Sequence, residues 1–168
     1  MRSTAPKYLR WLLLLWTIAI HAQTCMLLSR PVLTPDGTMT FDLSLRSASG
    51  ARASTLQWTF QYSIANIAAL RVDDGPALAP SGKSTFCAGN PGSLDCVAGG
   101  FNRNIISDGI VAKVTATLGP GFDSANLIFS SALGASPEGF FISVMAKSNA
   151  DAHSNCAPQP HRKGDAGK

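Results

Sequence analysis

The chain has 168 residues, of which 45% are hydrophobic, and a formal net charge of +4. The positive excess lies at the two ends, because residues 23–148 contain eight basic and eight acidic side chains. This neutral segment has no basic stripe, which argues against a nucleic-acid partner despite a sequence pI near 9.1. It also contains no histidine, which argues against Ser-His-Asp and Cys-His catalysis.

The first 22 residues are predicted to be a secretory signal peptide. A basic leader ends at Arg10, an apolar run occupies residues 11–20, and the small Ala22 precedes a plausible cleavage point. The run is shorter than the roughly 20 residues of a comfortable membrane span. We therefore expect a secreted, extracellular or periplasmic protein with no membrane span after cleavage. Two alternatives remain open: an uncleaved anchor helix, and a lipoprotein acylated at Cys25.

Residues 23–148 are predicted to form one all-β domain, since about 125 residues suit a single hydrophobic core. Hydrophobic and polar side chains alternate with a period of two, as in strands that bury one face. Gly and Pro separate these segments, and none of useful length shows a helical period. The predicted strands cover residues 39–45, 56–62, 108–118, 127–130 and 140–145; residues 63–70 are ambiguous, with a short helical turn as one possibility.

Two segments show which side chains should point inward. In residues 56–62, one side carries Leu56, Trp58, Phe60 and Tyr62, and the other carries Gln57, Thr59 and Gln61. In residues 108–118, one side carries Ile110, Ala112, Val114, Ala116 and Leu118, and the other carries Lys113, Thr115 and Thr117. Strands with one hydrophobic side each must cover it with a second sheet, which predicts a β-sandwich.

The four cysteines are predicted to form two disulfides, although three pairings are possible. Cys87 and Cys96 flank a turn-rich segment that can bring them together. Cys25 is then left with Cys156, and this pairing requires the first and last segments of the domain to be neighbours. The cysteines form no Cys-x-x-Cys pair and have no nearby histidine, so we expect no metal site. Residues 149–168 contain almost no large apolar side chain and are predicted to be a disordered tail.

The order of these features resembles the cohesin module, the dockerin-binding β-sandwich of cellulosome scaffoldins. The resemblance covers about residues 32–146 and rests on three stretches, "LQWTFQYSIANIAALRVDDGPAL", "SDGIVAKVTATLGPG" and "EGFFISV". It implies an antiparallel jelly-roll β-sandwich of about nine strands that binds a protein. The chain differs from the family pattern in its disulfides and in the insert between Cys87 and Cys96.

Two binding hypotheses follow. In the first, a flat polar sheet face binds a dockerin-like protein through the outward side chains Gln57, Thr59, Gln61, Lys113, Thr115 and Thr117. In the second, the module binds polysaccharide directly, which typically needs exposed rings. Trp58, Phe60 and Tyr62 share the parity of the core, so Phe101, Phe122 and Phe141 are the remaining candidates. Phe141 is the best of these, because it is out of phase with Phe140, Ile142 and Val144.

We expect a monomer without catalytic residues, cofactor or metal. A pair of carboxylates could serve a glycosidase, and the candidates are Asp73, Asp74, Asp108 and Glu138. Asp73 and Asp74 are adjacent and would point to opposite faces of an extended chain, and Asp108-Gly109 is typical of a turn. The chain also lacks the Asp-x-Asp-x-Asp-Gly loop of a calcium site, so any calcium would belong to a partner.

Overall fold

The computed structural model of this chain describes residues 23–48, 51–150 and 156. Almost all regular structure is β-strand, and the described elements, in chain order, are β1 (Thr24–Ser29), β2 (Val32–Leu33), β3 (Thr38–Arg46), β4 (Thr55–Tyr62), β5 (Ile67–Asp74), the short 3-10 helix η1 (Ala79–Ser81), β6 (Ser84–Asn90), β7 (Ser93–Gly99), β8 (Gly109–Leu118), β9 (Leu127–Ala135) and β10 (Phe141–Ala150). Among the residues described, no helix is long and apolar enough to cross a membrane.

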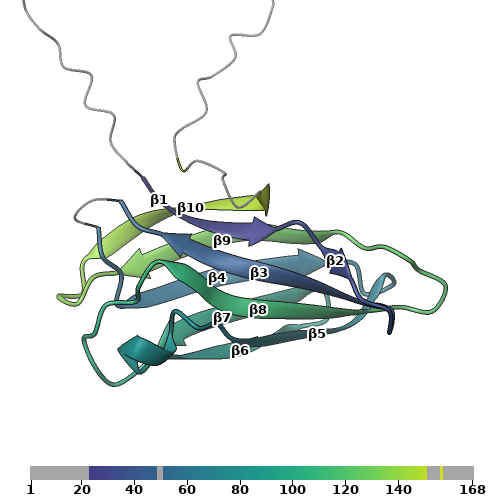
Figure 1. Cartoon of the computed structure of the whole chain (residues 1–168), viewed down its shortest axis with the longest axis horizontal. Helices are drawn as coiled ribbons and strands as arrows, with labels where there is room; N and C mark the ends of the chain where they lie inside the picture. The colour runs from purple at the N-terminus through teal and green to yellow at the C-terminus, as the bar shows by residue number, and fades with distance from the viewer. Residues whose placement is uncertain (1–22, 49–50, 151–155, 157–168) are drawn as a thin grey trace, which may run out of the picture.

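The strands form a two-layered sandwich (Figure 1). Nine strands follow one hydrogen-bonded order, β5-β8-β3-β1-β10-β9-β4-β7-β6, and the short β2 pairs with β3. The front layer in Figure 1 contains β5, β8, β3 and β1, and the back layer contains β9, β4, β7 and β6; β10 pairs with β1 and β9 and so joins them. The predicted jelly roll of about nine strands is confirmed. Its strands are antiparallel except for one pair, because β1 and β10 run parallel.

The core lies between the layers and is built from the alternating side chains. Leu56, Trp58 and Phe60 on β4 are completely buried, as predicted, and Tyr62 is half-buried. The opposite layer contributes every second residue of β3 and β8, namely Met39, Phe41, Leu43, Leu45, Ala112, Val114 and Ala116. The rings of Phe60 and Phe129 lie 5.8 Å apart within the back layer. The alternation therefore assigned the inner faces of these strands correctly.

One local prediction is wrong, and the structure also resolves the segment that the sequence left ambiguous. Phe140, expected inside with Ile142 and Val144, is 71% exposed, because it belongs to the turn at residues 136–140 and β10 begins only at Phe141. The ambiguous segment 63–70 is a turn followed by the start of β5. Ile67 N–H donates to the carbonyl of Ser63, and Ile67 is the first residue of the strand.

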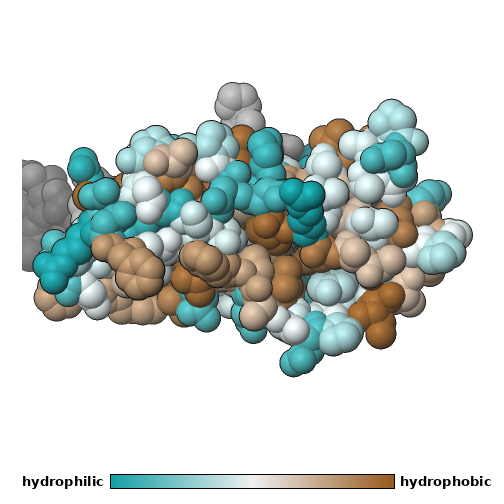
Figure 2. Space-filling view, turned by 90° about the horizontal axis from the view of Figure 1, so that it is seen from below, coloured by the Kyte–Doolittle hydropathy of each residue, from teal (hydrophilic) through white to brown (hydrophobic). Residues whose placement is uncertain are grey.

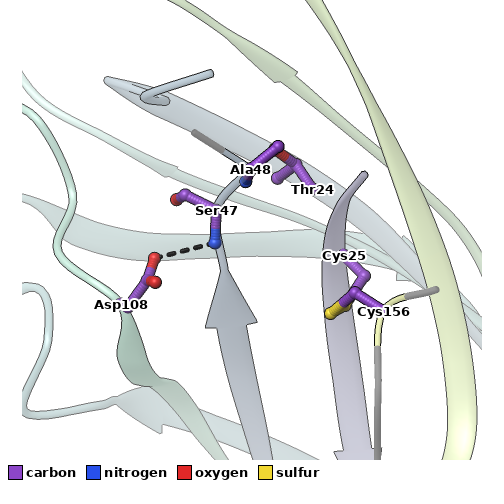
Figure 3. The surroundings of a disulfide bond; sticks show 6 residues. All are labelled: Thr24, Cys25, Ser47, Ala48, Asp108 and Cys156. Carbon is purple, nitrogen blue, oxygen red and sulfur yellow. Dashed lines mark hydrogen bonds between the residues drawn. A yellow bond between two sulfur atoms is a disulfide. The ribbon is translucent and has the colours of Figure 1, made fainter. Parts of the chain in front are cut away.

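Both predicted disulfides are present, Cys25–Cys156 and Cys87–Cys96. The first joins residues 131 positions apart, so by loop-closure entropy it stabilises the fold by about 5 kcal/mol, compared with about 3 kcal/mol for the local disulfide with its separation of 9. Figure 3 shows Cys156 beside β1 at the end of the sandwich. There, Ala48 N–H donates to the Thr24 hydroxyl at 3.0 Å.

The segments outside the domain are largely beyond the described residues. The predicted signal peptide at residues 1–22 lies outside them, and so does the predicted tail apart from residues 149–150 and Cys156. β10 continues to Ala150, past the domain boundary expected at residue 148. The domain therefore includes the end of this strand and the cysteine that returns to β1.

The buried ring of Trp58 provides a direct test of the core. We expect Trp58→Ala to lower the free energy of unfolding by about 3 to 5 kcal/mol, because it leaves a large cavity between the layers. The neighbouring Gln57→Ala removes an exposed side chain and should change stability by about 0.5 kcal/mol or less. Denaturant unfolding of both variants measures the difference. Equal stabilities would contradict the inward orientation of Trp58.

Candidate functional site

The six polar side chains predicted to form one binding patch lie on two opposite surfaces. Gln57, Thr59 and Gln61 are on the outer side of β4, which is in the back layer. Lys113, Thr115 and Thr117 are on the outer side of β8, which is in the other layer. Both strands turn their inner sides toward the same core, so their outer sides face away from each other. The expectation of one continuous patch is wrong, and each triplet belongs to a separate face.

The outer side of β8 and its neighbours, here called the β8 face, is polar and internally paired. It comprises Asp42, Arg71, Asp73, Lys113, Thr115 and Thr117. Lys113 Nζ lies 3.2 Å from the Asp42 carboxylate, and Arg71 lies 2.7 Å from that of Asp73. Exposed ion pairs of this kind contribute little to stability, but they satisfy the charges of the face locally. The large exposed hydrophobic residues of this layer are Val32 and Leu33, on the marginal strand β2.

The opposite surface, here called the β4 face, combines apolar and polar side chains. It comprises Gln57, Thr59, Gln61, Phe86, Asp95, Val97, Ile128, Leu133 and Phe141. Strand register places one row across four strands, in the order Phe86, Val97, Gln57, Leu133. The three apolar members of that row are 69%, 37% and 40% exposed. A second row places Ile128 beside Gln61, with Ile128 47% exposed.

Phe141 lies at the β10 side of the same face. It is 72% exposed and stands opposite Ala135 on β9, which in turn pairs with Thr55 on β4. Gly99, at the end of β7, faces the methyl group of Thr55. A strip of small side chains therefore separates Phe141 from Phe86 at the far edge. The outward orientation predicted for Phe141 is confirmed, whereas Trp58 and Phe60 are buried and offer no ring to a ligand.

Hydrophobic side chains gather on one side of the molecule in the space-filling view. Figure 2 is seen from below Figure 1, the side on which β5 and β6 lie. In this edge-on view, brown residues lie mainly in the middle and lower parts, toward the back layer, and hydrophilic residues are most frequent at the upper left. Contiguous exposed apolar surface bordered by polar residues is typical of interaction sites. The β4 face is therefore the stronger candidate of the two.

A buried lysine holds the connection between β7 and β8 at the end of this face. Lys83 is only 3% exposed, and its ammonium donates to the backbone carbonyl of Asn102 at 2.7 Å. The Asn102 and Asn104 side chains donate back to the carbonyls of Gly82 and Ser81, each at 3.2 Å. These bonds fix the segment that presents a fully exposed ring, Phe101.

The neighbouring β9–β10 connection lies close enough to interact electrostatically with this segment. The hydroxyl of Ser136 donates to the Glu138 carboxylate at 2.8 Å and is the main reason that the pKa of Glu138 is lowered. The positive charge of Arg103 contributes in the same direction. The burial of Lys83 could not be predicted from the sequence, because a single lysine in a turn-rich segment gives no sign of burial.

Comparisons with known proteins agree with the fold. No protein-family model matches the sequence, and no curated protein is significantly similar to it. The sixth cohesin of scaffoldin B from Acetivibrio cellulolyticus, solved with a mutant Cel5 dockerin, is 14% identical over 77% of this chain and 99% of that chain, with a TM-score of 0.59.

Two further cohesins show the same arrangement. The OlpA cohesin from Clostridium thermocellum, solved in a type I cohesin–dockerin complex, is 9% identical over 74% of this chain and 94% of that chain, with a TM-score of 0.62. A non-cellulosomal cohesin from the archaeon Archaeoglobus fulgidus is 12% identical over 75% of this chain and 87% of that chain, with a TM-score of 0.55. This chain therefore has the cohesin fold, as the sequence patterns predicted.

The buried position of Lys83 can be compared with the exposed position of Lys113. We expect Lys83→Ala to lower the free energy of unfolding by about 2 kcal/mol, because it removes a charged hydrogen bond and the packing of a buried aliphatic stem. Lys113→Ala removes only an exposed ion pair and should cost at most about 1 kcal/mol. Denaturant unfolding gives both values. Equal effects, or a larger effect at Lys113, would contradict the anchoring role of Lys83.

Proposed function

We propose that this chain is a secreted, noncatalytic binding module of the cohesin-like type, which attaches a folded protein partner to extracellular polysaccharide-degrading or adhesive assemblies. The row formed by Phe86, Val97, Gln57 and Leu133 is the observation that carries this proposal. Specific protein interfaces combine buried apolar contacts with polar groups over about 800 Å² per partner. The β4 face offers this combination across several adjacent strands, and the β8 face does not.

The proposed partner is a dockerin-like module. Two of the structural neighbours described above were solved as complexes with dockerins. The β4 face carries one charged residue near its centre, Asp95, whose carboxylate already accepts the Thr59 hydroxyl at 2.6 Å. We therefore expect binding to depend mainly on apolar contacts and on the amides of Gln57 and Gln61. Exported location is supported by the two disulfides, which persist in oxidising compartments.

A noncatalytic role is supported by the local partners of the four candidate carboxylates, each of which accepts a hydrogen bond or forms an ion pair. Asp73 pairs with Arg71, and Asp74 accepts the N–H of Thr85. Asp108 accepts the N–H of Ser47 in a bond drawn in Figure 3, and Glu138 accepts the hydroxyl of Ser136. Each carboxylate is therefore bonded to a different local partner. Among the described residues, no three His, Cys, Asp or Glu side chains are grouped to hold a metal ion.

Direct polysaccharide binding is the alternative function, and the exposure of Phe141 favours it. Phe140 and Phe101 are also exposed, at 71% and 114%, in the two connections at the same end of the sandwich. Stacking on sugar rings needs such exposed aromatic side chains. Protein binding is preferred to polysaccharide binding, because the apolar row at Val97 and Leu133 extends across the sheet away from these rings.

The two faces can be compared with matched substitutions. We expect Gln57→Arg combined with Leu133→Arg to weaken binding of dockerin modules from the source organism at least about tenfold, because long charged side chains would stand in the centre of the interface. Thr115→Arg combined with Thr117→Arg changes the β8 face equally and should leave the affinity unchanged. Isothermal titration calorimetry measures both, with thermal unfolding as the check on folding.

The outcomes distinguish the alternatives. Loss of binding only in the β8-face variant would contradict the assignment of the face. Retention of the wild-type protein on cellulose, chitin or xylan that is lost in Phe141→Ala, together with no dockerin affinity, would replace the proposal with direct glycan binding.

A further inference from the structure

The sandwich has two free strand edges, and they are protected very differently. β5 carries Arg71, Asp73 and Asp74, and its pairing with β8 shifts register between Ile67 and Ala69. Charges and irregular pairing prevent other strands from adding to an edge. β6 reads Ser-Thr-Phe-Cys-Ala-Gly-Asn, with no charge and no proline, and pairs with β7 without a register shift. All of its residues are exposed except the half-buried Thr85. β5 contacts β6 only at its start, where the Asp74 carboxylate accepts the Thr85 N–H, so among the described residues the edge of β6 is unprotected from Phe86 onward.

One hydrogen bond shows which backbone groups of β6 point away from β7. Thr85 N–H donates to the Asp74 carboxylate at 2.6 Å and so points away from β7. Backbone groups alternate in direction along an antiparallel strand, so the N–H and C=O groups of Cys87 and Gly89 also point away from β7. The Cα atoms of Cys87 and Cys96 are 4.1 Å apart, in agreement with the spacing of about 4.5 Å for opposite residues that exchange no backbone hydrogen bonds.

The disulfide makes this edge a rigid one. Cys87 is directly opposite the buried Cys96, so a covalent bond holds the middle of β6 against β7. An edge strand held in this way is ordered before it meets another strand, which lowers the entropy lost on pairing. The same strand carries Phe86, the outermost member of the apolar row on the β4 face.

We propose that β6 pairs antiparallel with β6 of a second copy of this chain, in place of the monomer expected from the sequence. With the two-fold axis at Ala88, Cys87 of each copy lies opposite Gly89 of the other, and the two pairs exchange about four backbone hydrogen bonds. The smallest side chains of the strand then meet at the axis. Phe86 lies beyond them on the β4 face, so the two β4 faces join into one surface.

Self-pairing fits this edge better than pairing with a foreign strand. The unpaired stretch is symmetric about Ala88, and an uncharged strand brings no like-charge repulsion to its own copy. Because β5 is protected, only the β6 edge of each chain can pair with another strand. Association therefore stops at a dimer. The edge is short, so the interface falls below about 1,200 Å² and the dimer is reversible.

Sedimentation velocity over a wide concentration range tests the dimer, using the protein with both disulfides formed. We expect the wild-type protein to shift from monomer to dimer as its concentration rises. Ala88→Lys places two lysines at the axis and should raise the dissociation constant at least about tenfold. The exposed Ala88 lies opposite Asp95, so the lysine is compatible with folding. Ala69→Lys, on the exposed surface of the protected edge β5, is the matched control and should dimerise like the wild type.

Amide hydrogen exchange locates the contact. The amides of Cys87 and Gly89 should become protected at high concentration in the wild type but not in Ala88→Lys, whereas the Thr85 amide should be protected in both. A wild-type protein that remains monomeric at every concentration would overturn the proposal. So would a dimer that Ala88→Lys leaves intact, or association that continues beyond two copies.

Discussion

The architecture depends on the alternation of side chains along β4. Leu56, Trp58 and Phe60 are completely buried between the layers, and this strand lies between β7, with which its pairing is unbroken, and β9, with which the register shifts once between Thr59 and Phe60. A slip of one residue would expose these three side chains and bury glutamines, so the hydrophobic effect determines the register. The same constraint places Gln57, Thr59 and Gln61 outward. The inner side of β4 therefore forms the core, and its outer side belongs to the candidate binding face. The proposed function uses this outer side.

The closure of the sandwich explains where its free surfaces lie. The parallel pairing of β1 with β10 joins the layers, and the Cys25–Cys156 disulfide connects the returning chain to β1. This removes two potential edges and brings the first and last segments together at one position. The remaining edges are β5 and β6, at the other side of the molecule (Figure 1). Lys83 and the Cys87–Cys96 disulfide both act near β6, where they order a turn and a strand that have little core to hold them.

The sequence predicted which side chains of a strand point inward better than it predicted which strands lie in the same layer. Alternation gave the inner residues of β3, β4 and β8 and the outward position of Phe141, because burial of one face has a period of two. It could not separate Gln57 from Thr115, since outward residues look alike in both layers. β1 was missed because residues 24–28 are all buried: Met26 and Leu28 face the main core, and Cys25 and Leu27 pack with Met145 and Cys156. Phe140 was misassigned because the turn at residues 136–140 delays the start of β10.

The central claim is that the β4 face is the binding surface. Amide hydrogen exchange of this protein, alone and saturated with a bound dockerin module, would map the contact directly. The account predicts slower exchange along β7 and β9 and at the exposed end of β4, in residues around Val97, Leu133 and Gln61, with β3, β5 and β8 unchanged. Protection confined to β8 and its neighbours Asp42 and Arg71 would contradict it.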